Sequence, residues 1–275
     1  MKSILFTLLQ FIPFLYGQGQ PGFNLVIDLG YNTNHFRDML VDNDTIIAYG
    51  LGYKDTIAWQ QGLLLAKIDS SGNVLMSKMI TDSLGDHLAI SMPWGKIIKT
   101  TDGGYAMTAA TVSRRSFFLI KLDHNLNAEF IREYPSEPPG LASFNYKPIQ
   151  TPNGYFIYGS KEIQPGYTDA CIRSVDQLGE TQWIKYFGKV NLADGFVSMD
   201  QVNDSLFVVG GVFSVSSTSG YSSIRFIDLH GNVTKEWNSS PEPDIGYLRK
   251  IIHVSDNKLI TFGAKVVDVI GGTKL

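Results

Sequence analysis

The chain has 275 residues, of which 44% are apolar and only 18% are charged. This composition is typical of a globular protein with a large core, and the length allows one large all-β domain or two smaller ones. The formal net charge of −3, with dispersed lysines and arginines, excludes a nucleic-acid-binding role that rests on bulk electrostatics, because phosphate binding needs a clustered basic surface.

The N-terminus has the composition of a secretory signal peptide. Lys2 precedes an apolar run over 4–17 that ends in small residues. The run is short for a membrane span, Pro13 interrupts it, and no second apolar run follows. We therefore expect residues 1–19 to be removed and the mature chain, 20–275, to be secreted or displayed at the cell surface, with no membrane span.

Residues 23–30 have the pattern of an outer β-strand and precede the first strand of a repeated unit. We expect this isolated strand to complete the last unit and so close a ring. The clearest unit lies at 94–134, where polar and glycine-rich turns separate four short strands. We expect these strands at 94–100, 105–112, 116–123 and 128–134.

The same unit recurs along the chain. An aspartate ends the third strand of a unit about every 53 residues, and a small residue lies inside each second strand. A glycine follows three residues after the aspartate, except in the second unit, where Leu126 takes its place and Asn125 and Asn127 can carry the turn. The aspartates are Asp69, Asp123, Asp176 and Asp228, and the small residues are Gly50, Ala109, Gly159, Gly210 and Gly263. The units cover 34–80, 94–134, 143–188, 194–240 and, in part, 247–275.

A period near 50 residues with four antiparallel strands per unit predicts an all-β protein, a β-propeller of four-stranded blades. One such sheet cannot bury both its faces, whereas a ring of them can. About five blade units are visible, and the last stops in mid-blade. We expect a truncated piece of a larger protein; the alternative is a five-bladed ring whose last eight residues improvise a third strand.

Several turn sequences resemble those of a known family. The segments DGGY at 102–105, KIDSSGN at 67–73 and LGETQW at 178–183 resemble the blades of secreted propeller-repeat proteins of Bacteroidota. Those proteins are in turn similar to quinoprotein-like propellers. The resemblance implies a propeller fold and export, and in many members a sorting domain for type IX secretion, which is not visible here. Nothing matches the residues with which quinoproteins hold their cofactor and calcium, so we expect no cofactor.

Other patterns that suggest chemistry are weak. Asp38 and Asp200 lie in first strands and could face the central channel, as the paired carboxylates of a polysaccharide hydrolase or lyase would. The five histidines show no ligand spacing, so we expect no metal site. The segment 174–183 is close to the sialidase Asp-box, which we interpret as a structural turn. The single cysteine, Cys171, is expected to be a buried apolar residue.

The positions of the loops in a propeller also predict where a ligand binds. In a propeller, the connections between blades and those between second and third strands emerge on one face, which we call the loop face. These are the longest and least repetitive segments here, and binding usually occurs in variable loops on a rigid scaffold. We therefore expect a monomeric, non-enzymatic module that binds a protein or glycan there. The candidate ligand-binding residues are Tyr53, Trp59, Arg114, Arg115, Tyr167 and Tyr221, although each could instead anchor its loop on the blades.

Overall fold

The computed structural model describes residues 29–31, 34–53, 61–89, 96–136, 143–189, 191–216, 219–239, 246–255, 258–265, 267–269 and 272–274. The predicted signal peptide, positions 23–28 of the predicted isolated strand, and Trp59 lie outside these ranges. Every regular element of the described residues is a β-strand.

Three four-stranded antiparallel sheets and one five-stranded antiparallel sheet follow one another along the chain, and we name them blades 1 to 4. Blade 1 contains β1 (Asn34–Asp42), β2 (Thr45–Tyr53), β3 (Gln61–Asp69) and β4 (Val74–Ile80). Blade 2 contains β5 (Leu88–Ala89), β6 (Ile97–Lys99), β7 (Tyr105–Thr111), β8 (Phe117–Leu122) and β9 (Ala128–Tyr134). Blade 3 contains β10 (Ser143–Thr151), β11 (Gly154–Gln164), β12 (Tyr167–Asp176) and β13 (Thr181–Phe187). Blade 4 contains β14 (Gly195–Asn203), β15 (Leu206–Ser214), β16 (Gly220–Asp228) and β17 (Val233–Asn238).

A fifth sheet, which we name blade 5, pairs β18 (Gly246–Ser255) with β19 (Lys258–Lys265). The last described residues form a separate hairpin of β20 (Val267–Val269) and β21 (Gly272–Lys274). In the structure, this hairpin does not supply a third strand to blade 5.

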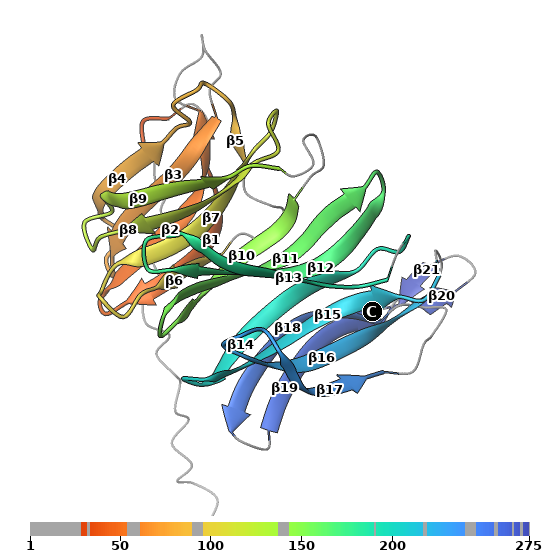
Figure 1. Ribbon diagram of the computed structural model, residues 1–275. Helices are drawn as coiled ribbons and strands as arrows, with labels where there is room; N and C mark the ends of the chain where they lie inside the picture. The colour runs from red at the N-terminus through yellow and green to blue at the C-terminus, as the bar shows by residue number, and fades with distance from the viewer. Residues whose placement is uncertain are drawn as a thin grey trace, which may run out of the picture.

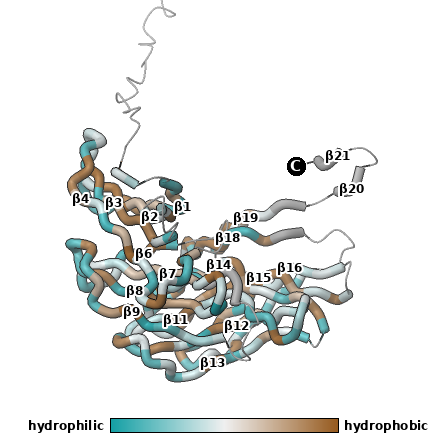
Figure 2. Tube along the Cα trace, turned by 90° about the horizontal axis from the view of Figure 1, so that it is seen from above, coloured by the Kyte–Doolittle hydropathy of each residue, from teal (hydrophilic) through white to brown (hydrophobic). Residues whose placement is uncertain are grey.

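The blades are arranged around a common centre, as expected for a β-propeller. Seen from above, the first strands β1, β6, β14 and β18 lie toward the middle of the molecule, whereas β4, β9 and β13 lie at its periphery (Figure 2). Within each of blades 1, 3 and 4 the strands follow one another in chain order from inside to outside (Figure 1). The predicted fold class is therefore confirmed.

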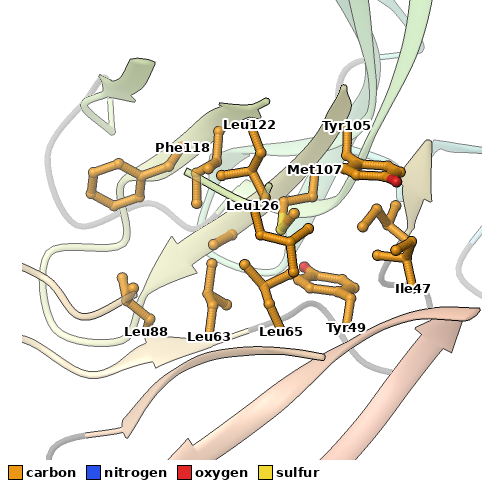
Figure 3. Packing of buried hydrophobic residues seen from close by; sticks show 13 residues of the cluster. Ile47, Tyr49, Leu63, Leu65, Leu88, Tyr105, Met107, Phe118, Leu122 and Leu126 are labelled. Carbon is orange, nitrogen blue, oxygen red and sulfur yellow. The ribbon is translucent and has the colours of Figure 1, made fainter. Parts of the chain in front are cut away.

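Neighbouring blades bury their faces against each other. Between blades 1 and 2, side chains of β2 and β3 interdigitate with those of β7 and β8 (Figure 3). Leu63, Leu65 and Tyr49 are fully buried there, and each leucine contributes roughly 1.5–3 kcal/mol of apolar burial. The strand β8 is buried along its whole length, because it lies in the middle of its sheet and between two blades.

Cys171 belongs to the core between blades 2 and 3 and is 2% exposed, as predicted for a buried apolar residue.

The landmark aspartates stabilise the turns that follow the third strands. Asp123 Oδ1 accepts the backbone N–H groups of Asn125 and Asn127, each over 2.8 Å. Asp176 does the same with Leu178 and Glu180, which confirms that the Asp-box-like segment is a structural turn. In blade 2 the turn is kept despite the missing glycine, because Leu126 itself adopts a φ of 58°.

Two details of the repeat differ from the prediction. The first strand of blade 2 is replaced by two short strands, because β5 and β6 both pair with β7. Of the predicted strand at 94–100, β6 covers 97–99, and positions 94 and 95 lie outside the described residues.

In blade 4 the glycine that approaches the first strand of its own blade is Gly211, where a Cβ would lie 2.3 Å from the Gly195 carbonyl oxygen. The corresponding residue in blade 1 is Gly50, which faces the His35 carbonyl. The predicted small residue of blade 4, Gly210, instead approaches the first strand of blade 5, where a Cβ would lie 2.2 Å from Ile251 Cδ1.

Candidate functional site

The connections between blades and the loops between second and third strands meet on one face, as the prediction required. The carboxylate of Asp86, in the connection from blade 1 to blade 2, accepts the backbone N–H groups of Ser113 and Arg114. Asp194, in the connection from blade 3 to blade 4, accepts the N–H of Ser214 over 2.7 Å. In both cases an aspartate in the connection that leads into a blade accepts hydrogen bonds from the loop between the second and third strands of that blade.

Arg114 lies at the centre of an ion-pair network on this face. Its guanidinium donates two hydrogen bonds to Asp82, of 2.8 and 3.1 Å, and one of 3.3 Å to Glu133. A further ion pair joins Arg114 to Asp86, with 3.7 Å between Nη1 and Oδ2. The hydrogen bond from Arg114 is the largest cause that lowers the pKa of Asp82 below its usual value. Arg114 therefore holds the inter-blade connection on blade 2, so its guanidinium is already engaged by three carboxylates.

Next to this network is a pocket of about 270 Å³ between blades 1 and 2. Five of its nine lining residues are apolar, and the other four carry hydroxyls or carboxylates. The lining residues are Ile80, Thr81, Asp82, Ser83, Leu88, Phe118, Ile120, Ile131 and Glu133. Such a pocket suits a compact ligand with an apolar face and hydrogen-bond donors at its edge, because the carboxylates are acceptors. It excludes an anionic ligand on electrostatic grounds, since the network has three carboxylates for one guanidinium.

The other predicted residues do not converge on this pocket. Arg115, which has a φ of 57°, forms an ion pair of 3.8 Å with Glu162 of blade 3. Tyr167 is 39% exposed at the start of β12, after the turn in which Gly166 donates its N–H to Glu162. Arg115 and Tyr167 therefore lie near the boundary of blades 2 and 3. Both remain candidates for contact with a ligand larger than the pocket.

Two further tyrosines lie elsewhere. Tyr221 stacks on Phe213 with 5.9 Å between ring centroids, and it packs on the core between blades 3 and 4. Its position corresponds to the loop-anchor alternative. Tyr53 is half-buried at the end of β2.

A pair of carboxylates with raised pKa values lies on the same face. Burial is the largest cause for both Asp169 and Asp194, and repulsion by Asp194 raises the pKa of Asp169 further. A Cβ on Gly188 would lie 2.5 Å from Asp169 Oδ1 and 2.7 Å from Asp194 Oδ2, so both oxygens face this glycine. Asp169 Oδ1 is buried without a hydrogen-bond partner among the described residues. Both Asp194 oxygens accept backbone N–H groups, from Ser214 and Lys189, which fits a structural role.

The two carboxylates considered for catalysis in the central channel have structural partners. Asp38 Oδ2 accepts the N–H of Ile97 over 2.9 Å, and Asp200 Oδ2 accepts the N–H of His253 over 2.7 Å. Each carboxylate thus joins its own blade to the next. Their engagement with backbone N–H groups gives no support to a hydrolase or lyase that uses this pair.

The sequence did not point to Asp82, Asp86 or Glu133 as partners of Arg114. A usable signal was the insertion between blades 1 and 2, whose two aspartates flank a turn, because a connection that must fold back on its blade needs acceptors for backbone N–H groups. Among the described residues, no group of three or more possible metal ligands occurs. No helix in the same ranges is long and apolar enough to cross a membrane.

Comparisons with known proteins found no related sequence, but they found a similar solved structure. No protein-family model matches the sequence, and no curated protein matches it. Among solved structures, one described as "Structure of Dos1 propeller" matches with a TM-score of 0.48 and 12% identity, over 78% of this chain. The match covers 49% of that structure, so this chain spans about half its length. The assignment to the propeller fold rests on the blades themselves.

Proposed function

We propose that this protein is an exported, non-enzymatic β-propeller that binds a glycan on its loop face, with one sugar residue in the pocket between blades 1 and 2. A sugar ring combines an apolar face with hydroxyl donors at its edge. The lining of the pocket offers the complementary features, since it combines the apolar side chains of Phe118, Ile120 and Ile131 with two carboxylate acceptors, Asp82 and Glu133. This complementarity is the observation that carries the proposal.

Two sequence features support export and origin. The N-terminal segment has the charge and apolar run of a signal peptide. The turn sequences resemble those of secreted propeller-repeat proteins of Bacteroidota, and we assign the chain to that group as part of this proposal. Cleavage after export is tested by N-terminal sequencing of the protein from a culture supernatant, which should begin near residue 20; recovery of the full-length chain inside the cell would contradict it.

Glycan binding is tested with the purified chain on an array of neutral and acidic glycans, followed by calorimetry with the best oligosaccharide. The variant E133Q replaces one of the two carboxylates that line the pocket. It should weaken binding by about tenfold, because one hydrogen bond to a charged group is lost. The matched control is E129Q, on the same strand β9, where the carboxylate pairs with Lys121 over 2.8 Å at the opposite end. E129Q should leave binding unchanged.

Three outcomes separate the possibilities. Glycan binding that E133Q weakens and E129Q does not supports the proposal. Capture of a protein ligand with the same sensitivity to E133Q would keep the site but overturn the ligand class. Absence of glycan binding, or equal effects of the two variants, would overturn the proposal.

A further inference from the structure

The first strands of the blades place a polar side chain at one recurring position. In blades 1, 3, 4 and 5 the first strand has a β-bulge, and the first paired residue after it is Asp38, Lys147, Ser198 or Lys250. In blade 2 the strand is broken instead, and Lys96 directly precedes β6. Three of the five positions are therefore lysines. Bulges re-aim side chains and are frequent beside binding sites.

The first strands β1, β6, β14 and β18 lie toward the middle of the molecule (Figure 2), and β10 contacts β6 and β14. Like Asp38, two of the side chains at the recurring position form a hydrogen bond to the next blade. Lys147 Nζ donates to the Val197 carbonyl oxygen over 2.7 Å, and Ser198 Oγ accepts the Ile251 N–H over 3.0 Å. The recurring position thus faces the axis and spans adjacent blades. We call its three lysines, Lys96, Lys147 and Lys250, the axial lysines.

The axial lysines repel one another. Burial is the largest cause that lowers the pKa of Lys96 to about 8, and Lys250 lowers it further, against the opposing effects of Asp200 and Asp38. Burial also lowers the pKa of Lys147 to about 8, with added repulsion from Lys96 and Lys250 and an opposing effect of Asp38. The three ammonium groups therefore act on each other across three different blades.

Local compensation of this charge is incomplete. The two nearby carboxylates, Asp38 and Asp200, each accept a backbone N–H of the neighbouring blade. Among the described residues, neither Lys96 nor Lys250 forms an ion pair. Lys147 is only 9% exposed, so its ammonium group lies largely out of the solvent. Lys250, by contrast, is exposed, so the cluster is open to solvent on that side.

We propose that the axial lysines form a binding site for an oxyanion, either phosphate or a carboxylate group, at the axis of the propeller. An anion there would offset the repulsion among three ammonium groups from three blades and so hold those blades together. Lysine suits this role, because its ammonium is a compact point charge that binds phosphate without a fixed orientation. The site is distinct from the loop-face pocket and does not depend on the glycan proposal.

The test is calorimetric titration of the full chain with inorganic phosphate at pH 7, beside a second titration with an oligogalacturonate. Phosphate binding that the oligosaccharide does not match indicates a free anion, and the reverse indicates the carboxylates of a polysaccharide; either result supports the site. The substitution K250M should weaken binding about tenfold or more, since it removes one charged contact at an exposed position. K147M should weaken it as much.

K147M also removes the contact to Val197, so its fold is verified by circular dichroism, and K250M carries the test if K147M does not fold. The control is K235M. This lysine is exposed and lies on β17, the outermost strand of blade 4, three strands away from the first strand β14. Affinity should also fall between pH 7 and pH 9.5, because the pKa values of Lys96 and Lys147 are about 8 and these two ammonium groups lose their protons in this range. Binding at pH 8 should therefore take up protons from the buffer. No binding of either anion, or equal affinity in K250M and K235M, would overturn the proposal.

Discussion

The carboxylate of Asp38 in blade 1 accepts the backbone N–H of Ile97 in blade 2 over 2.9 Å. Asp200 forms the equivalent contact from blade 4 to blade 5, with the N–H of His253. The first strand of a propeller blade has one unpaired edge, and its N–H groups need acceptors. In these blades the acceptor comes from the neighbouring blade, so the axial contacts couple one sheet to the next.

Removal of the Asp38 acceptor should destabilise the protein. Ile97 is 4% exposed, so D38A leaves its N–H without a partner in a buried position, at a cost of about 1–3 kcal/mol. D38N retains an oxygen acceptor and should cost less than half as much. Urea unfolding of both variants measures the difference, and equal loss in D38A and D38N would show that charge, not the acceptor, is what matters.

Leu126 combines backbone strain with burial. Its φ of 58° costs a non-glycine residue roughly 1–2 kcal/mol, whereas its side chain is 1% exposed in the core between blades 1 and 2. L126A loses the buried side chain and keeps the strain, so it should lose about 2–4 kcal/mol of stability. L126G loses the same side chain but relieves the strain.

L126G should therefore be more stable than L126A by about 1 kcal/mol, the reverse of the usual order of alanine and glycine. Thermal unfolding of the two variants side by side checks this order. A more stable L126A would mean that the left-handed conformation is not retained in solution.

The Arg114 network should make stability sensitive to acid. Because Arg114 lowers the pKa of Asp82 in the folded state, the contribution of this carboxylate is complete above its unfolded pKa and is lost as the pH falls through the folded value. R114M should cost about 2 kcal/mol at pH 7, since carboxylates on the inter-blade connection lose their partner. The variant should also show a flatter dependence of Tm on pH between pH 2 and 5.

The control is R132M, whose arginine forms an exposed ion pair of 2.6 Å with Glu180 on an outer strand. Exposed pairs of this kind contribute about 0–1 kcal/mol. R132M should therefore retain both the stability and the acid sensitivity of the parent chain. A similar loss in R114M and R132M would contradict the structural role of the network.

The carboxyl pair of Asp169 and Asp194 on the loop face should make the stability of the protein fall, not rise, as the pH increases. Burial and Asp194 raise the folded-state pKa of Asp169, so the native state holds an extra proton above the unfolded pKa and loses stability as the pH rises through this window. D169N removes the penalty and should stabilise the protein by about 1 kcal/mol at pH 7, with less effect at pH 4.

D194N is the matched comparison. Asp194 uses both oxygens to accept backbone N–H groups, from Lys189 and Ser214, and a carboxamide offers one oxygen instead of two. D194N should therefore destabilise the protein at both pH values. Measurements of Tm against pH for the two variants test this difference. A lower Tm for D169N than for the parent chain would indicate that the Asp169 carboxylate has a stabilising partner in solution.

Much of the fold was predictable because the signals are local. Asp123 and its turn, and the residues of β9, follow from hydrogen bonds and alternation within about ten residues of chain, which recur with the period of the blade. Even where Leu126 replaces the turn glycine, the preceding aspartate holds the same turn. The sequence alone therefore determined the four strands of blades 1, 3 and 4, their order and the propeller class.

The sites depended on tertiary structure. Arg114 was expected to face a ligand, yet it binds Asp82 and Asp86, 32 and 28 residues earlier in the chain, because the connection between blades 1 and 2 folds back on the loop face. The convergence of Lys96 and Lys147 at the axis depends on a broken strand in one blade and a bulge in another. The sequence repeats the lysines, but only the ring packing of the blades brings their charges together, because charge interactions act through space and not along the chain.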